Sequence, residues 1–153
     1  MASKRFQYLE QDWEVTGLGR GHGVGFGFLP PITSWAAEFA AVSRPELGKF
    51  PGRIPAADPS DVGNAELQRA LEDAFVVETL RRSGEPWRTV ESLAEETRVD
   101  RGRVYRILEW ESDDVVQADL PDDQGRVLYA ARERHAETTP FVKRYLDVLG
   151  SST

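Results

Sequence analysis

The stretch that most constrains this chain runs from Asp100 to Trp110, with the sequence DRGRVYRILEW. Aspartate is a preferred residue at helix N-caps, and Val104, Ile107 and Leu108 recur at the spacing of one helical face. The opposite side of such a helix would carry the arginines. We therefore expect a short helix here, with one buried stripe and one charged face.

Two helices are predicted before this stretch. In the segment 64–82, apolar residues recur at spacings of three and four: Leu67, Ala70, Leu71, Ala74, Phe75, Val77 and Leu80. Thr89 is then expected to cap a helix with the sequence VESLAEET, and Arg98 and Val99 to form a tight connection into Asp100. Two short helices joined by a turn of this length form a helix-turn-helix.

Two β-rich runs follow, VVQADL and RVLYAAR, on either side of a Pro-Asp-Asp-Gln-Gly turn. This pattern predicts a β-hairpin. A last helix is expected to begin at Thr139 and Pro140, because proline is favoured in the first helical position. Its apolar stripe would consist of Phe141, Val142, Tyr145, Leu146 and Leu149.

The text TVESLAEETRVDRGRVYRILEW, followed by VVQADLPDDQGRVLYAARER, resembles the winged helix-turn-helix superfamily of bacterial and archaeal regulators. The resemblance covers residues 64–149 and concerns the order of elements. It implies that the third helix enters the DNA major groove and that the wing tip touches the backbone or minor groove. It also implies dimerisation through terminal helices in many members, and protein interaction without DNA binding in others.

The first 63 residues are rich in glycine and proline. Residues 1–16 fit a strand or a short helix, and residues 17–27 hold six glycines at every second position. That period fits an extended strand, an irregular segment, or a surface where a ligand or another backbone approaches closely. A nucleotide loop has little support, because Gly-Lys-Ser/Thr is absent.

A short apolar helix is expected near 35–42, after Pro30-Pro31, and prolines at 45, 51, 55 and 59 predict a linker or strap. The predicted fold is therefore α+β and mainly α. A winged helix-turn-helix domain over 64–149 would follow a Gly/Pro-rich extension and linker over 1–63.

Charge weakens the case for DNA binding. The net charge is −7, and residues 64–153 hold 13 basic against 19 acidic residues. The predicted wing tip carries Asp122 and Asp123 with only Arg126 to offset them. Since duplex affinity comes largely from neutralised phosphates, these charges oppose tight binding.

The leading functional hypothesis is a DNA-binding transcriptional regulator that uses the Asp100–Trp110 helix for recognition. Arg103 and Arg106 would reach base edges or phosphates, with Arg101, Tyr105 and the wing residue Arg126 in support. The same arginines would also suit a solvated helix face on which Arg106 pairs with Glu109.

The alternative hypothesis is a protein-protein interaction adaptor without DNA binding. It would dock through aromatic residues of the N-terminal segment: Trp13, Phe26, Phe28, Trp35 and Phe39. The expected partners are thus double-stranded DNA or a protein, and a second copy of the chain in a homodimer.

Several classes of activity have no support in the sequence. There is no cysteine, and the two histidines, His22 and His135, lie far apart without ligand or triad spacing. We therefore expect no enzyme, no cofactor and no metal site. The chain has no signal peptide pattern and no apolar run near the roughly 18 residues that span a bilayer, so a cytoplasmic protein without membrane contact is expected.

Overall fold

The computed structural model describes residues 2–22, 34–111 and 114–132. The chain divides into two compact units, Met1–Glu78 and Thr79–Thr153. The division falls inside helix α1 (Asn64–Arg82), so that this helix belongs to both units. The sequence predicts a boundary near residue 63, at the start of the same helix.

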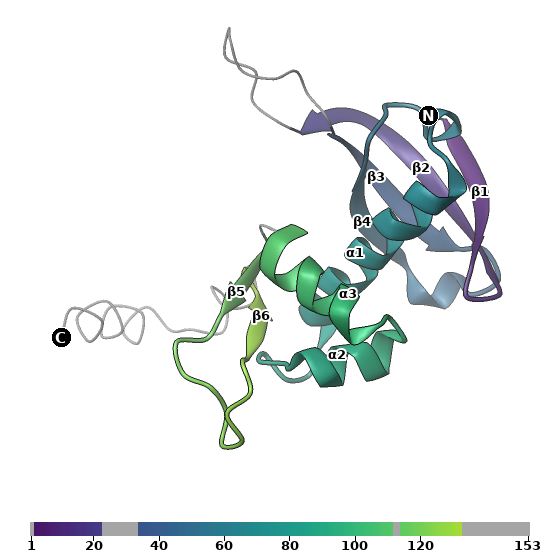
Figure 1. Ribbon diagram of the computed structural model, residues 1–153. Coiled ribbons are helices and arrows are strands. Elements are labelled where there is room, and N and C mark those ends of the chain that lie inside the picture. The colour runs from purple at the N-terminus through teal and green to yellow at the C-terminus, as the bar shows by residue number, and fades with distance from the viewer. Residues whose placement is uncertain (1, 23–33, 112–113, 133–153) are drawn as a thin grey trace, which may run out of the picture. The chain divides into compact units, whose positions relative to one another are not determined.

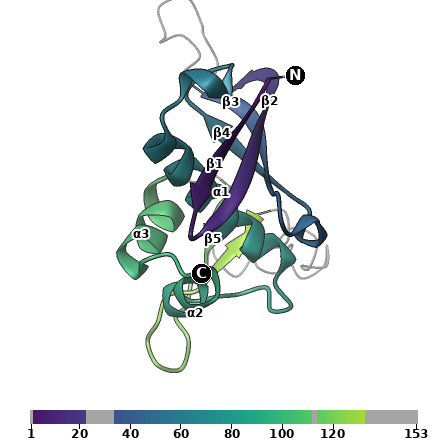
Figure 2. The ribbon, with the colours of Figure 1, turned by 90° about the vertical axis from the view of Figure 1, so that its right-hand side faces the viewer.

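The first unit is built on a four-stranded antiparallel sheet in the order β1-β2-β3-β4 (Figure 1). Its strands are β1 (Ser3–Tyr8), β2 (Gln11–His22), β3 (Ser34–Ala41) and β4 (Lys49–Ile54). Two 3-10 turns flank β4, namely η1 (Pro45–Leu47) and η2 (Pro59–Asp61). The first part of α1 lies along the sheet in both views (Figures 1 and 2) and contributes Leu67, Ala70, Leu71 and Ala74 to its core.

Side chains on the inner face of this sheet alternate between large and small rows. Strand pairing places Val15, Phe39 and Phe50 in one row, and Gly17, Ala37 and Gly52 in the next. A Cβ atom on Gly52 would lie 2.8 Å from Cε2 of Phe39 and 3.1 Å from Cβ of Ala74. Glycine at position 52 therefore lets the phenylalanine ring and the helix reach the sheet.

The predicted fold, a mainly helical winged helix-turn-helix after an irregular extension, is wrong, because a four-stranded sheet precedes the helices, whereas helices come first in a winged helix. The segment 35–42, expected as a helix, lies almost entirely in β3, where Ala37, Phe39 and Ala41 alternate toward the core. Cross-strand pairing here overrides the helix propensity of alanine. The expected linker contains β4, and because β4 is an edge strand it tolerates Pro51.

The second unit contains the helices and the hairpin that the sequence predicts between residues 79 and 132, except that the helix expected over Asp100–Trp110 continues as a π-helical turn after Arg106. They are the end of α1, α2 (Val90–Thr97), α3 (Arg101–Arg106), the π-helical turn η3 (Ile107–Glu111), β5 (Val115–Gln117) and β6 (Tyr129–Ala131). Arg88 and Tyr129 add an antiparallel bridge in which each backbone N–H donates to the other's carbonyl over 2.8 Å. The helix expected from Pro140 lies outside the described residues.

Candidate nucleic-acid interface

The turn between α2 and α3 is fixed by short-range hydrogen bonds. Thr97 Oγ1 donates to the carbonyl of Leu93 over 2.6 Å and accepts from the N–H of Val99 over 3.3 Å. Thr97 and Val99 are buried. Between them, Arg98 adopts a left-handed backbone conformation, and its N–H donates to the carbonyl of Ala94. The turn is therefore anchored on both sides of an exposed arginine.

Helix α3 begins as predicted at Asp100. One carboxylate oxygen of this residue accepts from the N–H groups of Gly102 and Arg103, over 3.0 and 3.4 Å. Val104, Ile107 and Leu108 are buried, which confirms the predicted apolar stripe. The cap and the stripe together set which face of α3 meets the core and which meets solvent.

The solvent face of α3 carries Arg101, Tyr105 and Arg106, all of them exposed. Arg103, which the sequence places beside Arg106 as a leading contact, is half-buried and already has an interaction partner. Among the residues that the structure describes, neither Arg101 nor Arg106 forms an ion pair. The expected pairing of Arg106 with Glu109 is therefore not present, and two cations stay uncommitted on this face.

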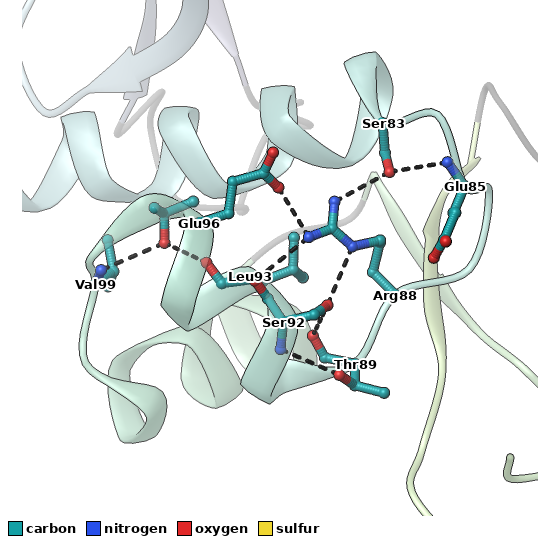
Figure 3. A network of polar contacts seen from close by, with 9 residues as sticks. Ser83, Glu85, Arg88, Thr89, Ser92, Leu93, Glu96 and Val99 are labelled. Atoms are coloured by element: carbon teal, nitrogen blue, oxygen red, sulfur yellow. Dashed lines mark hydrogen bonds and ion pairs between the residues drawn. The ribbon is translucent and has the colours of Figure 1, made fainter. Parts of the chain in front are cut away.

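A polar network centred on Arg88 connects the end of α1 to α2 (Figure 3). Its guanidinium donates to Ser83 Oγ at the end of α1 over 3.0 Å and to Ser92 Oγ on α2 over 3.1 Å. It also lies 2.8 Å from Glu96 Oε2, while the Arg88 side chain is only 13% exposed. Because its backbone also bridges Tyr129, this arginine joins α1, α2 and β6, a role that its sequence context does not predict.

The end of α3 is tied to the hairpin by a second polar contact. Tyr129 on β6 donates its hydroxyl hydrogen to the carboxylate of Glu109 in η3. Burial and the neighbouring Glu109 carboxylate raise the pKa of Tyr129 well above its usual value. The phenol thus stays a neutral donor, and the contact fixes the π-helical turn against the sheet.

The loop between β5 and β6, residues 118–128 and predicted from the sequence as the wing tip, is closed by Asp122. This carboxylate accepts from the N–H groups of Gln124 and Arg126, over 2.9 and 2.8 Å, and from Arg126 Nε over 2.9 Å. Those bonds, led by the Arg126 N–H, hold the pKa of Asp122 below its ordinary value. Asp122 is therefore a turn residue, and its partner Arg126 is less available to DNA than the sequence suggests.

The aromatic residues proposed for protein docking are not gathered on one surface of the first unit. Trp13 and Phe39 are core residues with 3% and 0% exposure, and Trp13 packs edge-on against Phe50. Trp35 is half-buried on β3, while Phe26 and Phe28 lie outside the described residues. A partner could therefore reach Trp13 and Phe39 only if the core opened.

Other kinds of site receive no support from the described ranges. Within residues 2–22, 34–111 and 114–132, no cluster of three or more acidic or histidine side chains could hold a metal ion. His135 lies outside these ranges. No helix within them combines the length and the apolar character needed to cross a bilayer.

No family model, no curated protein and no solved structure matches this chain.

Proposed function

We propose that this protein binds double-stranded DNA through α3 of its second unit and acts as a transcriptional regulator. The observation that carries the proposal is the pair of exposed arginines, Arg101 and Arg106, on a helix whose other face is buried. Neither forms an ion pair with a described residue. An α-helix fits the major groove, where an arginine fork pairs with guanine and a guanidinium also binds phosphate.

The elements around α3 support this use of the helix. The cap at Asp100, the turn anchored by Thr97 and the Tyr129–Glu109 contact fix both ends of the segment 100–111. A contact helix held in this way loses little conformational freedom on binding, so less of the interaction free energy is spent on ordering.

The acidic balance of the chain sets the expected strength of binding. A net charge of −7 repels a polyanion, so affinity should be modest and strongly dependent on salt. The ion pair of Asp122 with Arg126 offsets part of the wing's repulsion, while Asp123 stays exposed. The alternative, docking to a protein through the N-terminal aromatic residues, has less support, since Trp13 and Phe39 belong to the core.

Duplex binding by the full chain tests the proposal. With two arginines neutralising phosphates, affinity for mixed-sequence duplex should fall at least about tenfold between roughly 50 and 200 mM salt. Repeated selection from a pool of random duplexes should enrich a common sequence. Absence of binding near about 50 mM salt contradicts DNA binding, and binding without enrichment contradicts the regulator.

A further inference from the structure

The arginines described in the second unit fall into two groups. Most are committed within the fold: Arg81 pairs with Asp114, Arg88 with Glu96 and Arg126 with Asp122, and Arg82, Arg103 and Arg132 also have partners. The others are Arg98, Arg101 and Arg106, which are exposed and form no ion pair with a described residue. The uncommitted cations therefore lie within nine consecutive positions, on α3 and on the turn before it.

Arg98 occupies a backbone conformation that favours a different residue. Its φ is 60° and its ψ 19°, in the left-handed region where glycine or asparagine ends a helix without strain. It is one of three non-glycine residues with positive φ among the described residues. The chain thus carries a long cationic side chain at the apex of the helix-turn-helix, where local folding alone favours glycine.

The wing offers no comparable cation. Between residues 118 and 128 the basic residue is Arg126, and its Nε is bonded to Asp122, whereas Asp119 and Asp123 are exposed acids. With three aspartates against one arginine, this loop carries a net charge of −2. That charge opposes contact with phosphates, because like charges repel.

We propose that the DNA backbone beside α3 is held by Arg98 in the turn, and that the wing makes no phosphate contact. This inference rests on the proposed function and adds to it the element that binds the backbone. Arg98 precedes Arg101 and Arg106 along the chain, so one continuous segment, residues 98–106, supplies a phosphate contact from the turn beside the contacts of the helix. The wing would then have a structural role only, since the hydrogen bonds of Asp122 are made within the wing itself.

A matched pair of substitutions tests this inference, because each removes one positive charge from the second unit. Arg98→Gln should lower duplex affinity about eightfold near 0.1 M salt and reduce the log–log salt slope by about 0.9, the contribution of one phosphate. Arg126→Gln should leave affinity within about twofold and the slope unchanged. The opposite pattern, with loss in Arg126→Gln alone, overturns the inference and assigns the backbone contact to the wing.

Two further variants separate charge from folding at position 98. Arg98→Gly relieves the left-handed backbone, so its unfolding midpoint should rise while its affinity falls as in Arg98→Gln. Arg98→Lys should retain most of the affinity. If Arg98→Gln and Arg98→Gly bind like the wild type, the inference fails while DNA binding stands, whereas a wild-type chain that binds no duplex overturns the proposed function and this inference together.

Discussion

The guanidinium of Arg88 lies 2.8 Å from the carboxylate of Glu96, which lies in the last turn of α2. The two partners differ in their surroundings, since the side chain of Arg88 is 13% exposed and that of Glu96 54%. The same guanidinium also binds Ser83 and Ser92. The arginine is therefore the shared centre of the network, and the glutamate is one of several partners at its edge.

Replacing Arg88 should therefore destabilise the chain more than replacing Glu96. Arg88→Met removes the hydrogen bonds of the guanidinium to Ser83 and Ser92 and its ion pair with Glu96, which should destabilise the chain by about 2 kcal/mol. Glu96→Gln removes one partly exposed charge and should cost less than about 1 kcal/mol. Denaturant unfolding followed by far-UV circular dichroism measures both values, and equal losses would contradict a network centred on Arg88.

The close approach at Gly52 predicts a steric effect in the first unit. Gly52→Ala places a methyl group against Phe39 and Ala74, so it should destabilise by about 1–3 kcal/mol through overpacking. Gly84→Ala is the control, because a Cβ there meets nothing within 4 Å, and it should change stability by less than about 0.5 kcal/mol. A neutral Gly52→Ala would show that the helix and sheet are packed less closely than described.

The Asp122 turn predicts an acid-side titration. Hydrogen bonds from Arg126 and Gln124 keep the pKa of this carboxyl below its ordinary value of 3.8 in the folded protein. The stabilisation of the wing tip should therefore be complete above pH 3.8 and be lost as the pH falls through the lower, folded-state pKa. Carbon-detected NMR titration of the Asp122 side chain measures it, and a midpoint at or above 3.8 would remove the turn described for the wing.

A substitution at Asp100 should change DNA binding without changing stability. Asn caps helices about as well as Asp, so Asp100→Asn should keep α3 and leave stability within about 0.5 kcal/mol. It also removes a negative charge beside Arg101, so affinity for duplex should rise about two- to fivefold at low salt. Fluorescence anisotropy with labelled duplex gives the affinity, with Asp58→Asn in the first unit as the control. Equal or weaker binding by a stable Asp100→Asn would place the DNA away from the start of α3.

The second unit could be predicted from sequence largely because its signals are local. Thr89 and Asp100 cap their helices through hydrogen bonds to residues two or three positions away, and the stripe of α3 repeats within one turn. Such features depend little on the rest of the chain. The role of Arg88 could not be predicted, because its partners lie on several elements.

The first unit was misassigned because its strands depend on distant partners. The alanines around Phe39 favour a helix by propensity, but β3 pairs with β2 on one side and β4 on the other, and this pairing makes the segment a strand. A Cβ on Gly17 would come within 2.6 Å of the Ala57 carbonyl oxygen, so the requirement for glycine at position 17 comes from a residue forty positions away in the sequence. The candidate site residues also depend on distant contacts, because these contacts decide which side chains are exposed. Arg101 and Arg106 are exposed, whereas Arg103 is half-buried. Trp35 is half-buried, whereas Trp13 and Phe39 are buried.

The most direct test of DNA binding by α3 compares two double variants of equal net charge. Arg101→Gln/Arg106→Gln removes both uncommitted arginines of the helix, whereas Arg44→Gln/Arg53→Gln removes two exposed arginines of the first unit. The account predicts that the first lowers duplex affinity roughly 60-fold near 0.1 M salt and the salt slope by about 1.8, and that the second stays within about twofold of the wild type. Equal affinities for the two variants would contradict the account.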